Sequence, residues 1–109
     1  MEMKKTTLKI GKHLIGPGEI PFVIAEIGNN HNGDFDRAKK LIDLALECGA
    51  HCAKFQMRNL KSLYRSKSLE KKSDDLSTEY TLDLLNKFEL SIEQQKSLAD
   101  YCKSKGILY

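Results

Sequence analysis

The stretch Phe22-Val-Ile-Ala-Glu-Ile-Gly28, followed at once by Asn29-Asn-His-Asn-Gly33, decides the fold of this sequence. The first seven residues form a nearly continuous apolar run, which is typical of a strand buried on both faces of a parallel sheet. The next five residues are polar, and Asn and Gly tolerate turn conformations. A buried strand that leads directly into a polar loop indicates an α/β fold, whose active sites are built where strands end.

A helix and a second strand are predicted directly after this loop. Asp34 can cap the helix, apolar residues recur at helical spacing from Phe35 to Leu46, and Gly49 is the expected left-handed terminator. After a very short link, residues 51–57 are predicted to form the second strand. A strand, a helix and a strand make a βαβ unit, so the two strands are expected to be parallel.

On the N-terminal side of this unit, a β-hairpin is predicted. Two short apolar runs, residues 7–10 and 13–16, flank Gly11-Lys12, which suits a type II′ turn. The hairpin is followed by a Gly- and Pro-rich segment that breaks regular structure.

The C-terminal half begins with a polar segment over residues 58–76, which predicts a solvated, mobile loop whose Lys61, Tyr64 and Arg65 could contact an anion. Ser77 can cap a short helix after it, and Ser91-Ile-Glu-Gln94 fits a capping box. The helix that follows is expected to end near Gly106, and one side of it is expected to carry Ile92, Leu98, Ala99 and Cys102. Residues 107–109 are predicted to begin a third strand.

Length and composition restrict the function classes. The 109 residues, 40% apolar and 30% charged, indicate one soluble globular domain. No apolar run approaches the length of a membrane span, and no apolar segment follows the basic N-terminus, so we expect neither a spanning helix nor a signal peptide. Three cysteines without an export signal predict reduced thiols in the cytoplasm. The net charge of +3 is too small to indicate nucleic acid or anionic membranes as partners.

Strand periodicity identifies candidate site residues. Alternate residues share a face, so Glu26 lies on one face of the first strand, and Lys54 and Gln56 share a face of the second. If these faces correspond, a carboxylate, an ammonium and an amide converge at the C-terminal ends of adjacent strands. The alternative is a buried Glu26–Lys54 ion pair that only neutralises itself.

Two other groups of polar residues have both a functional and a structural interpretation. His31 follows the C-terminal end of a strand, a position that favours a binding role, yet a histidine in a loop is more often just a polar loop residue. Asn30 and its neighbours can simply shape the turn. The spacing of Cys48, His51 and Cys52 resembles part of a metal site, but it lacks the paired short spacings of structural zinc and favours buried apolar thiols instead.

Together, these residues resemble the AEIG-x-NH-x-G signature of the sialic acid synthase family, which makes N-acetylneuraminate and related nonulosonates such as legionaminate. The similarity extends over nearly the whole chain from about Leu8. The further matching segments are Ala38–Asp43, Gly49-Ala50, Ala53-Lys-Phe-Gln56, Tyr80–Leu85, Phe88–Ser91 and Tyr101–Ile107.

The resemblance implies a fold of α/β class. It implies an N-terminal β-hairpin followed by the first βα units of a TIM (β/α)8 barrel, incomplete in this chain. We therefore expect a hairpin and linker over residues 1–20 and a partial barrel domain over residues 21–109, truncated as strand three begins.

The resemblance also implies an activity. Members condense phosphoenolpyruvate with an N-acetylated hexosamine such as N-acetylmannosamine, in its open-chain aldehyde form, and release phosphate. They use a divalent metal, Mn or Mg, and commonly form homodimers through a C-terminal antifreeze-like domain. The expected partners are these small-molecule substrates.

Individual roles carry over by position. Glu26 matches the strand-one glutamate beside the metal and sugar, where it could orient a water or handle a proton. Lys54 matches the lysine that neutralises phosphoenolpyruvate, and Gln56 matches the glutamine that contacts the sugar. Asn30 and His31 match the signature loop and are candidate substrate-binding residues. The family's metal-binding histidines lie farther downstream, so we expect no metal ligand here and no activity from these residues alone.

Two alternatives stay open. One is a non-catalytic α/β binding or assembly module derived from the family, whose open sheet edges would need partners. The other is a half-barrel completed by a second chain. In each case an open piece of barrel is expected to expose apolar surface and to self-associate.

Overall fold

The computed structural model describes residues 6–58 and 83–109. The predicted contacts of Lys61, Tyr64 and Arg65, the cap at Ser77 and nearly all of the predicted 58–76 loop lie outside these residues. The proposed division at residue 20 stays a prediction.

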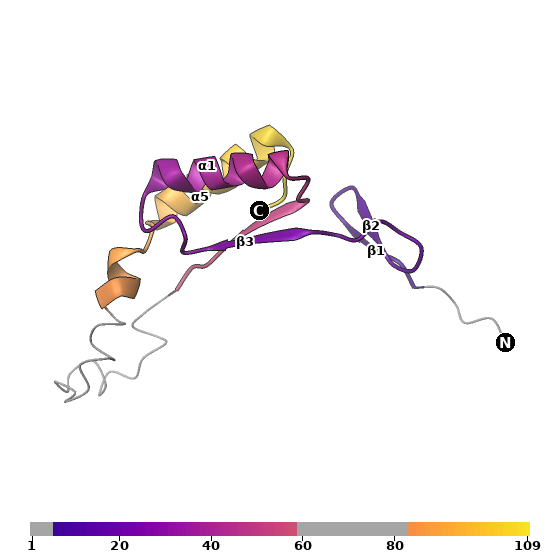
Figure 1. The fold of residues 1–109 in the computed structure, drawn as a ribbon, viewed down its shortest axis with the longest axis horizontal. Helices are drawn as coiled ribbons and strands as arrows, with labels where there is room; N and C mark the ends of the chain where they lie inside the picture. Colours follow the sequence, from indigo (N-terminus) through magenta and orange to yellow (C-terminus); the bar gives the residue numbers. More distant parts are fainter. Residues whose placement is uncertain (1–5, 59–82) are drawn as a thin grey trace, which may run out of the picture.

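The N-terminal hairpin is confirmed. Strand β1 (Leu8–Ile10) pairs antiparallel with β2 (His13–Ile15), and Leu8 lies opposite Ile15. The hairpin extends beyond the N-terminal end of β3 (Figure 1).

The predicted βαβ unit is also confirmed. Strand β3 (Ile24–Gly28) pairs in parallel with β4 (Cys52–Phe55), and α1 (Phe35–Glu47) connects them. In place of the predicted third strand, a single parallel bridge pairs Leu108 with Cys52 of β4: the Leu108 N–H donates to the His51 carbonyl at 3.1 Å and the Ala53 N–H donates to the Leu108 carbonyl at 2.8 Å.

Both helices begin where local side chains predict. The Asp34 carboxylate accepts the Arg37 N–H at 3.0 Å at the start of α1. At the start of α5 (Ile92–Lys105), the Ser91 hydroxyl accepts the Gln94 N–H at 3.1 Å, and the Gln94 side chain accepts the Ser91 N–H at 2.9 Å. Each cap satisfies amide groups that have no partner within the helix.

The predicted inner side of α5 is partly wrong. Ile92 is 61% exposed, whereas Gln95 is buried beside Leu98 and Cys102. Helical side chains tilt toward the N-terminus, so a residue in the first turn extends past the surface on which the rest of the helix packs.

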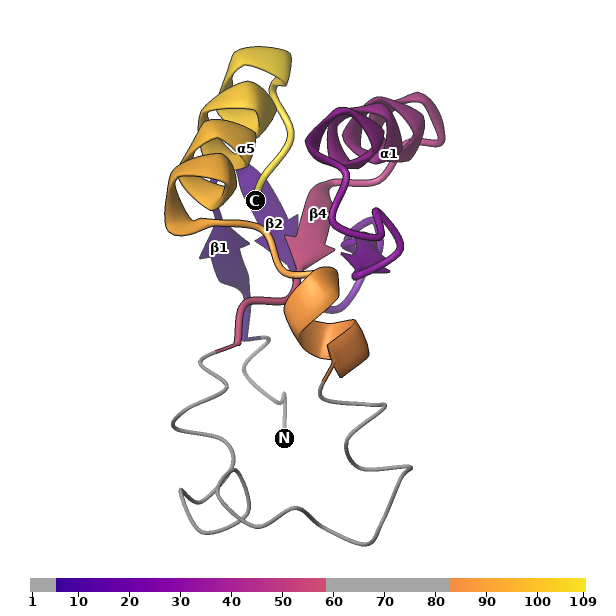
Figure 2. The ribbon, with the colours of Figure 1, turned by 90° about the vertical axis from the view of Figure 1, so that its left-hand side faces the viewer.

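Helices α1 and α5 lie side by side on the same face of the β3–β4 pair (Figures 1 and 2). Between these layers lies the apolar core, whose buried members are Ile27, Ala38, Ile42, Ala45, Ala53, Leu90, Leu98, Cys102 and Ile107. A short helical segment over residues 83–87 leads to Leu90.

The other face of the sheet is open in the part of the chain that the structure describes. Ile24 is 52% exposed. The prediction of a strand buried on both faces is therefore wrong for these residues, because the two helices cover one side only. The arrangement is a mixed α/β layer, and closure into a barrel stays a prediction. Among the described helices, none is long and apolar enough to cross a membrane.

Candidate functional site

The predicted meeting of Glu26 and Lys54 is confirmed. The parallel register places the two residues directly opposite each other. The Lys54 Nζ donates to the Glu26 Oε2 at 2.5 Å. Both side chains lie on the sheet face opposite the helices, near the C-terminal ends of β3 and β4.

The Glu26–Lys54 ion pair is exposed, so it is not the buried, self-neutralising pair that the sequence left as an alternative. The Lys54 and Glu26 side chains are 54% and 51% exposed. Ion pairs that are this accessible typically contribute at most about 1 kcal/mol to folding. The pair therefore contributes little to the stability of the fold, and a ligand can reach it from the open face of the sheet.

Gln56 joins the same edge of the sheet. A Cβ atom built on Gly28 would lie 3.2 Å from the Glu26 Oε1 and 3.9 Å from the Gln56 Cδ, so the carboxylate and the amide both border Gly28. The Arg58 guanidinium donates to the Gln56 Oε1 at 2.5 Å. This bond occupies the amide oxygen and leaves the Gln56 NH2 group as a donor for a ligand. Sequence reasoning did not identify Arg58.

An open hollow of about 340 Å³ adjoins Lys54. Its other lining residues are Ile24, Cys52, Phe55, Met57 and Tyr109. A single ammonium on an otherwise apolar wall is the kind of surface that can orient a small anion through one charge-assisted contact.

His31 does not join the ion pair. It is 1% exposed, and its ring stacks on Phe55 with centroids 6.0 Å apart. The His31 Nδ1 accepts the Gly33 N–H at 3.0 Å, while its Nε2 is buried with no hydrogen-bond partner among the described residues. His31 remains a residue of the loop after β3, and the loop folds back so that the ring packs against the core.

Burial lowers the pKa of His31, and the nearby Gly28 carbonyl and Asp34 carboxylate offset this only in part. Below pH 6.5 the unfolded chain therefore binds a proton that the folded chain excludes. We expect the free energy of unfolding to fall as the pH drops below 6.5, until the folded-state pKa is reached. Urea unfolding between pH 7.5 and 5.0 measures this.

His31→Asn is the matched variant for that measurement. It can keep an acceptor for the Gly33 N–H but has no titrating ring. If the wild-type chain and His31→Asn lose stability in parallel as the pH falls, His31 is not the source of the effect.

The remaining candidates of the sequence analysis are more dispersed. Asn30 is exposed, and its N–H donates to the Ile27 carbonyl at 3.0 Å, which shapes the turn after β3.

Among residues 6–58 and 83–109, no three His, Cys, Asp or Glu side chains converge as a metal would require. Cys48 is exposed, so the prediction of a buried thiol is wrong there, whereas Cys102 is buried. Burial raises the pKa of the Cys102 thiol to about 11.

Sequence reasoning missed one partly buried polar contact. The Tyr109 hydroxyl hydrogen-bonds to the Gln95 side chain, and the Tyr109 ring stacks on Phe55 with centroids 5.6 Å apart. The only available signal was a glutamine on the apolar side of a helix. The contact ties α5 to the end of the sheet beside the hollow.

Comparison with known proteins shows that this chain is similar to synthases of sialic and legionaminic acids. Residues 41–109 match the NeuB family. The chain is 41% identical over 94 residues to N-acetylneuraminate-9-phosphate synthase of Mus musculus, covering 81% of this chain and 25% of that protein. It is 37% identical over 91 residues to N,N'-diacetyllegionaminic acid synthase of Campylobacter jejuni, covering 80% and 27%.

Solved structures agree. The chain matches the crystal structure of N-acetylneuraminic acid synthetase from Leptospira borgpetersenii, in complex with citrate, with a TM-score of 0.72 and 27% identity. The match covers 95% of this chain and 33% of that one. The chain spans about a quarter of the length of the curated relatives it matches, between 25% and 27% in the examples above.

Proposed function

Because this chain belongs to the NeuB family, we propose that it supplies the N-terminal part of a nonulosonate synthase that condenses phosphoenolpyruvate with an N-acetylated hexosamine. The observation that carries the proposal is the Glu26–Lys54–Gln56 group at the C-terminal edge of the sheet. The relatives are named as synthases of N-acetylneuraminate 9-phosphate and of legionaminic acid, which supports a small-molecule sugar substrate.

The proposed reaction joins the methylene carbon of phosphoenolpyruvate to the aldehyde carbon of the sugar. Water adds at the carbon that bears the phosphate, and phosphate leaves as the ketone forms. Phosphoenolpyruvate carries a carboxylate and a phosphate, and Lys54 provides a cation for one of them. The Gln56 NH2 group donates to a sugar oxygen, because the Gln56 Oε1 already accepts a hydrogen bond from Arg58.

Glu26 has the role of orienting the water or accepting a proton. Its carboxylate is accessible on the open face and bonded to Lys54, so the arrival of an anion at Lys54 would release it for this task. Asn30 and His31 lie in the loop after β3, which is proposed to contact the substrate. His31 is buried, so its proposed role is to hold this loop in place.

The resemblance to the family implies a divalent metal ion, Mn or Mg, and we propose such an ion for the complete enzyme. Such an ion would polarise the aldehyde. The described residues bring together too few ligating side chains to hold it by themselves, so no step above depends on it. Dimer formation and a cytoplasmic location are likewise proposals.

Replacing Lys54 by alanine is expected to weaken phosphoenolpyruvate binding at least tenfold. A hydrogen bond to a charged group contributes about 1.5–3 kcal/mol, and 1.4 kcal/mol corresponds to a factor of ten. The measurement is isothermal titration of phosphoenolpyruvate, with manganese present, into the wild-type chain and Lys54→Ala. Lys40→Ala is the control, because Lys40 is an exposed lysine on α1.

Equal affinity in all three proteins would contradict the role of Lys54. If the folded wild-type chain binds nothing, the site needs more of the protein, and the same pair of variants is then compared for phosphate release by the complete enzyme. We expect no turnover by the isolated chain, and turnover by it would contradict that expectation.

A further inference from the structure

A row of three polar side chains runs along β4 and past its end. Lys54, Gln56 and Arg58 occupy alternate positions of the chain, so an extended backbone places them on one side. The Arg58 Nη2 donates to the Gln56 Oε1 at 2.5 Å, which shows that the third member of the row reaches back to the second. Arg58 is half-buried although it is charged, whereas Gln56 is exposed. The proposed function uses Lys54 and Gln56 but gives Arg58 no task of its own.

The hydrogen bond from Arg58 fixes which end of the Gln56 amide is left for a ligand. A guanidinium has donors only, so the amide atom beside it is the oxygen. The NH2 group of Gln56 then remains available, and within residues 6–58 and 83–109 it donates to no protein acceptor. The last side-chain torsion of a glutamine is broad and nearly two-fold, so without Arg58 the oxygen and the NH2 group would exchange places at little cost. Arg58 therefore determines whether a ligand meets a donor or an acceptor.

The charges around this amide favour the same kind of ligand atom. The Glu26 carboxylate and the Gln56 amide both border Gly28. The Glu26 carboxylate is already bonded to Lys54. With Arg58 included, the edge of the sheet carries one positive charge in excess. An ammonium on a ligand would meet this excess charge together with the N–H donors of Gln56, whereas a ligand oxygen would accept from them.

We propose that Arg58 is a positioning residue for ligand selectivity: it holds the Gln56 amide with its NH2 group outward, so that this edge takes a sugar whose amino group is acylated and rejects the same sugar as a free ammonium. The inference rests on the proposed function, in which Gln56 contacts the sugar. A site that presents donors binds an oxygen acceptor and leaves a second donor without a partner. We expect the chain to prefer N-acetylmannosamine over mannosamine by about tenfold, and Arg58→Ala to reduce this preference to about threefold or less.

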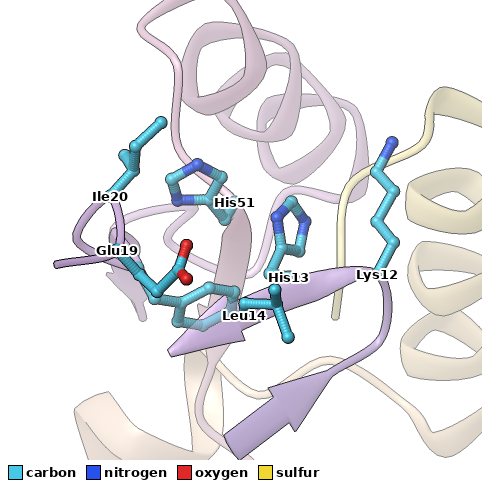
Figure 3. A pocket seen from close by; sticks show the side chains of 7 residues that line it. Lys12, His13, Leu14, Glu19, Ile20 and His51 are labelled. Atoms are coloured by element: carbon cyan, nitrogen blue, oxygen red, sulfur yellow. The ribbon is translucent and has the colours of Figure 1, made fainter. Parts of the chain in front are cut away.

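The first test needs no ligand and uses side-chain amide NMR on the 109-residue chain. The heteronuclear NOE of the Gln56 NH2 group reports its mobility, and its chemical shift reports the hydrogen bond at the amide oxygen. We expect Arg58→Ala to lower the NOE and move the shift, and Arg58→Lys, which keeps a charge and a donor, to restore part of both. Lys12→Ala is the matched control and should change neither signal, because it also removes one cation but from the hollow beside the hairpin (Figure 3).

The second test measures selectivity with the two sugars. N-acetylmannosamine and mannosamine are titrated into each protein at about pH 6.5, where an aliphatic amine of this kind is mostly an ammonium, and binding is followed at the Gln56 NH2 signals. Arg58→Ala should change the ratio of the two dissociation constants, whereas Lys12→Ala should leave it as in the wild-type chain. Circular dichroism checks that each variant is folded.

A further variant keeps the proposal testable if Arg58→Ala does not fold. Gln56→Glu retains an oxygen that can accept from Arg58 but has no NH2 group to present. The proposal predicts that this variant loses the preference for N-acetylmannosamine, because its outward atom is an acceptor that suits an ammonium.

Three results would overturn the proposal: Gln56 NH2 signals that do not change in Arg58→Ala or change equally in Lys12→Ala, a sugar preference that is the same with and without Arg58, and a folded wild-type chain that binds neither sugar. The proposed synthase function fails by a different result, which is an unchanged affinity for phosphoenolpyruvate in Lys54→Ala. Arg58 is intact in that measurement and the NMR test uses no substrate, so the two failures can be told apart.

Discussion

Replacing Ile42 by alanine is expected to lower the free energy of unfolding by about 2–5 kcal/mol. The Ile42 side chain has no solvent exposure and lies in the core between α1, α5 and the sheet. Truncation removes buried apolar surface and leaves a cavity that the surrounding helices can fill only in part. Domains of this size have roughly 5–15 kcal/mol of stability in total, so this single change removes a large fraction of it. Urea unfolding followed by circular dichroism measures the loss.

Leu44→Ala is the matched control, because Leu44 lies on the same helix and is 54% exposed. It removes a similar volume from solvent-exposed surface, and we expect a loss of no more than about 1 kcal/mol. Similar losses for the two variants would contradict the placement of α1 against α5 and the sheet.

Replacing Gly33 by alanine is expected to lower the free energy of unfolding by about 2–6 kcal/mol and to open the loop after β3. Gly33 has a φ of 77°, and a Cβ there would lie 2.8 Å from the Lys87 carbonyl oxygen and 3.3 Å from the Phe88 Cα. The unfavourable φ costs roughly 1–3 kcal/mol, and forcing backbone atoms apart costs a similar amount. Thermal or urea unfolding measures the sum of the two.

Gly49→Ala separates these two costs. Gly49 has a φ of 85°, and a Cβ there would meet nothing within 4 Å, so this variant reports backbone strain alone. The additional loss in Gly33→Ala is then the contact with residues 87–88. Since Gly33 donates its N–H to His31, the NMR titration midpoint of His31 should also move toward that of a free histidine. An unchanged midpoint together with equal stability losses would show that the loop does not depend on this contact.

Features that depend on neighbours in the sequence could be predicted well. Asp34 and Ser91 cap their helices because a side chain reaches an amide three residues away. The facing of Glu26 and Lys54 followed from the two-residue period of strands and from a parallel βαβ connection.

Features that depend on distant contacts could not be predicted. His31 is buried because its loop packs against Phe55, and Gln95 is buried because Tyr109 satisfies it. Among residues 6–58 and 83–109, β3 is covered on one face only, because an apolar run shows that a strand can be buried on both faces but not which elements pack against it. Ile92 was misplaced because periodicity does not show where a packed surface ends.

The sequence by itself determined the order of elements, the helix ends, the parallel strand pair and the residues that carry charge at the edge of the sheet. These follow from local hydrogen bonding and from fixed backbone periods, which act over a few residues. Only the tertiary structure decided that the Glu26–Lys54 pair is accessible and that the Arg58 guanidinium donates to the Gln56 side-chain oxygen. It also decided that His13 of the hairpin lies against His51, which precedes β4. Burial and contact between distant residues arise from packing, and packing depends on every element that the chain brings to the same place.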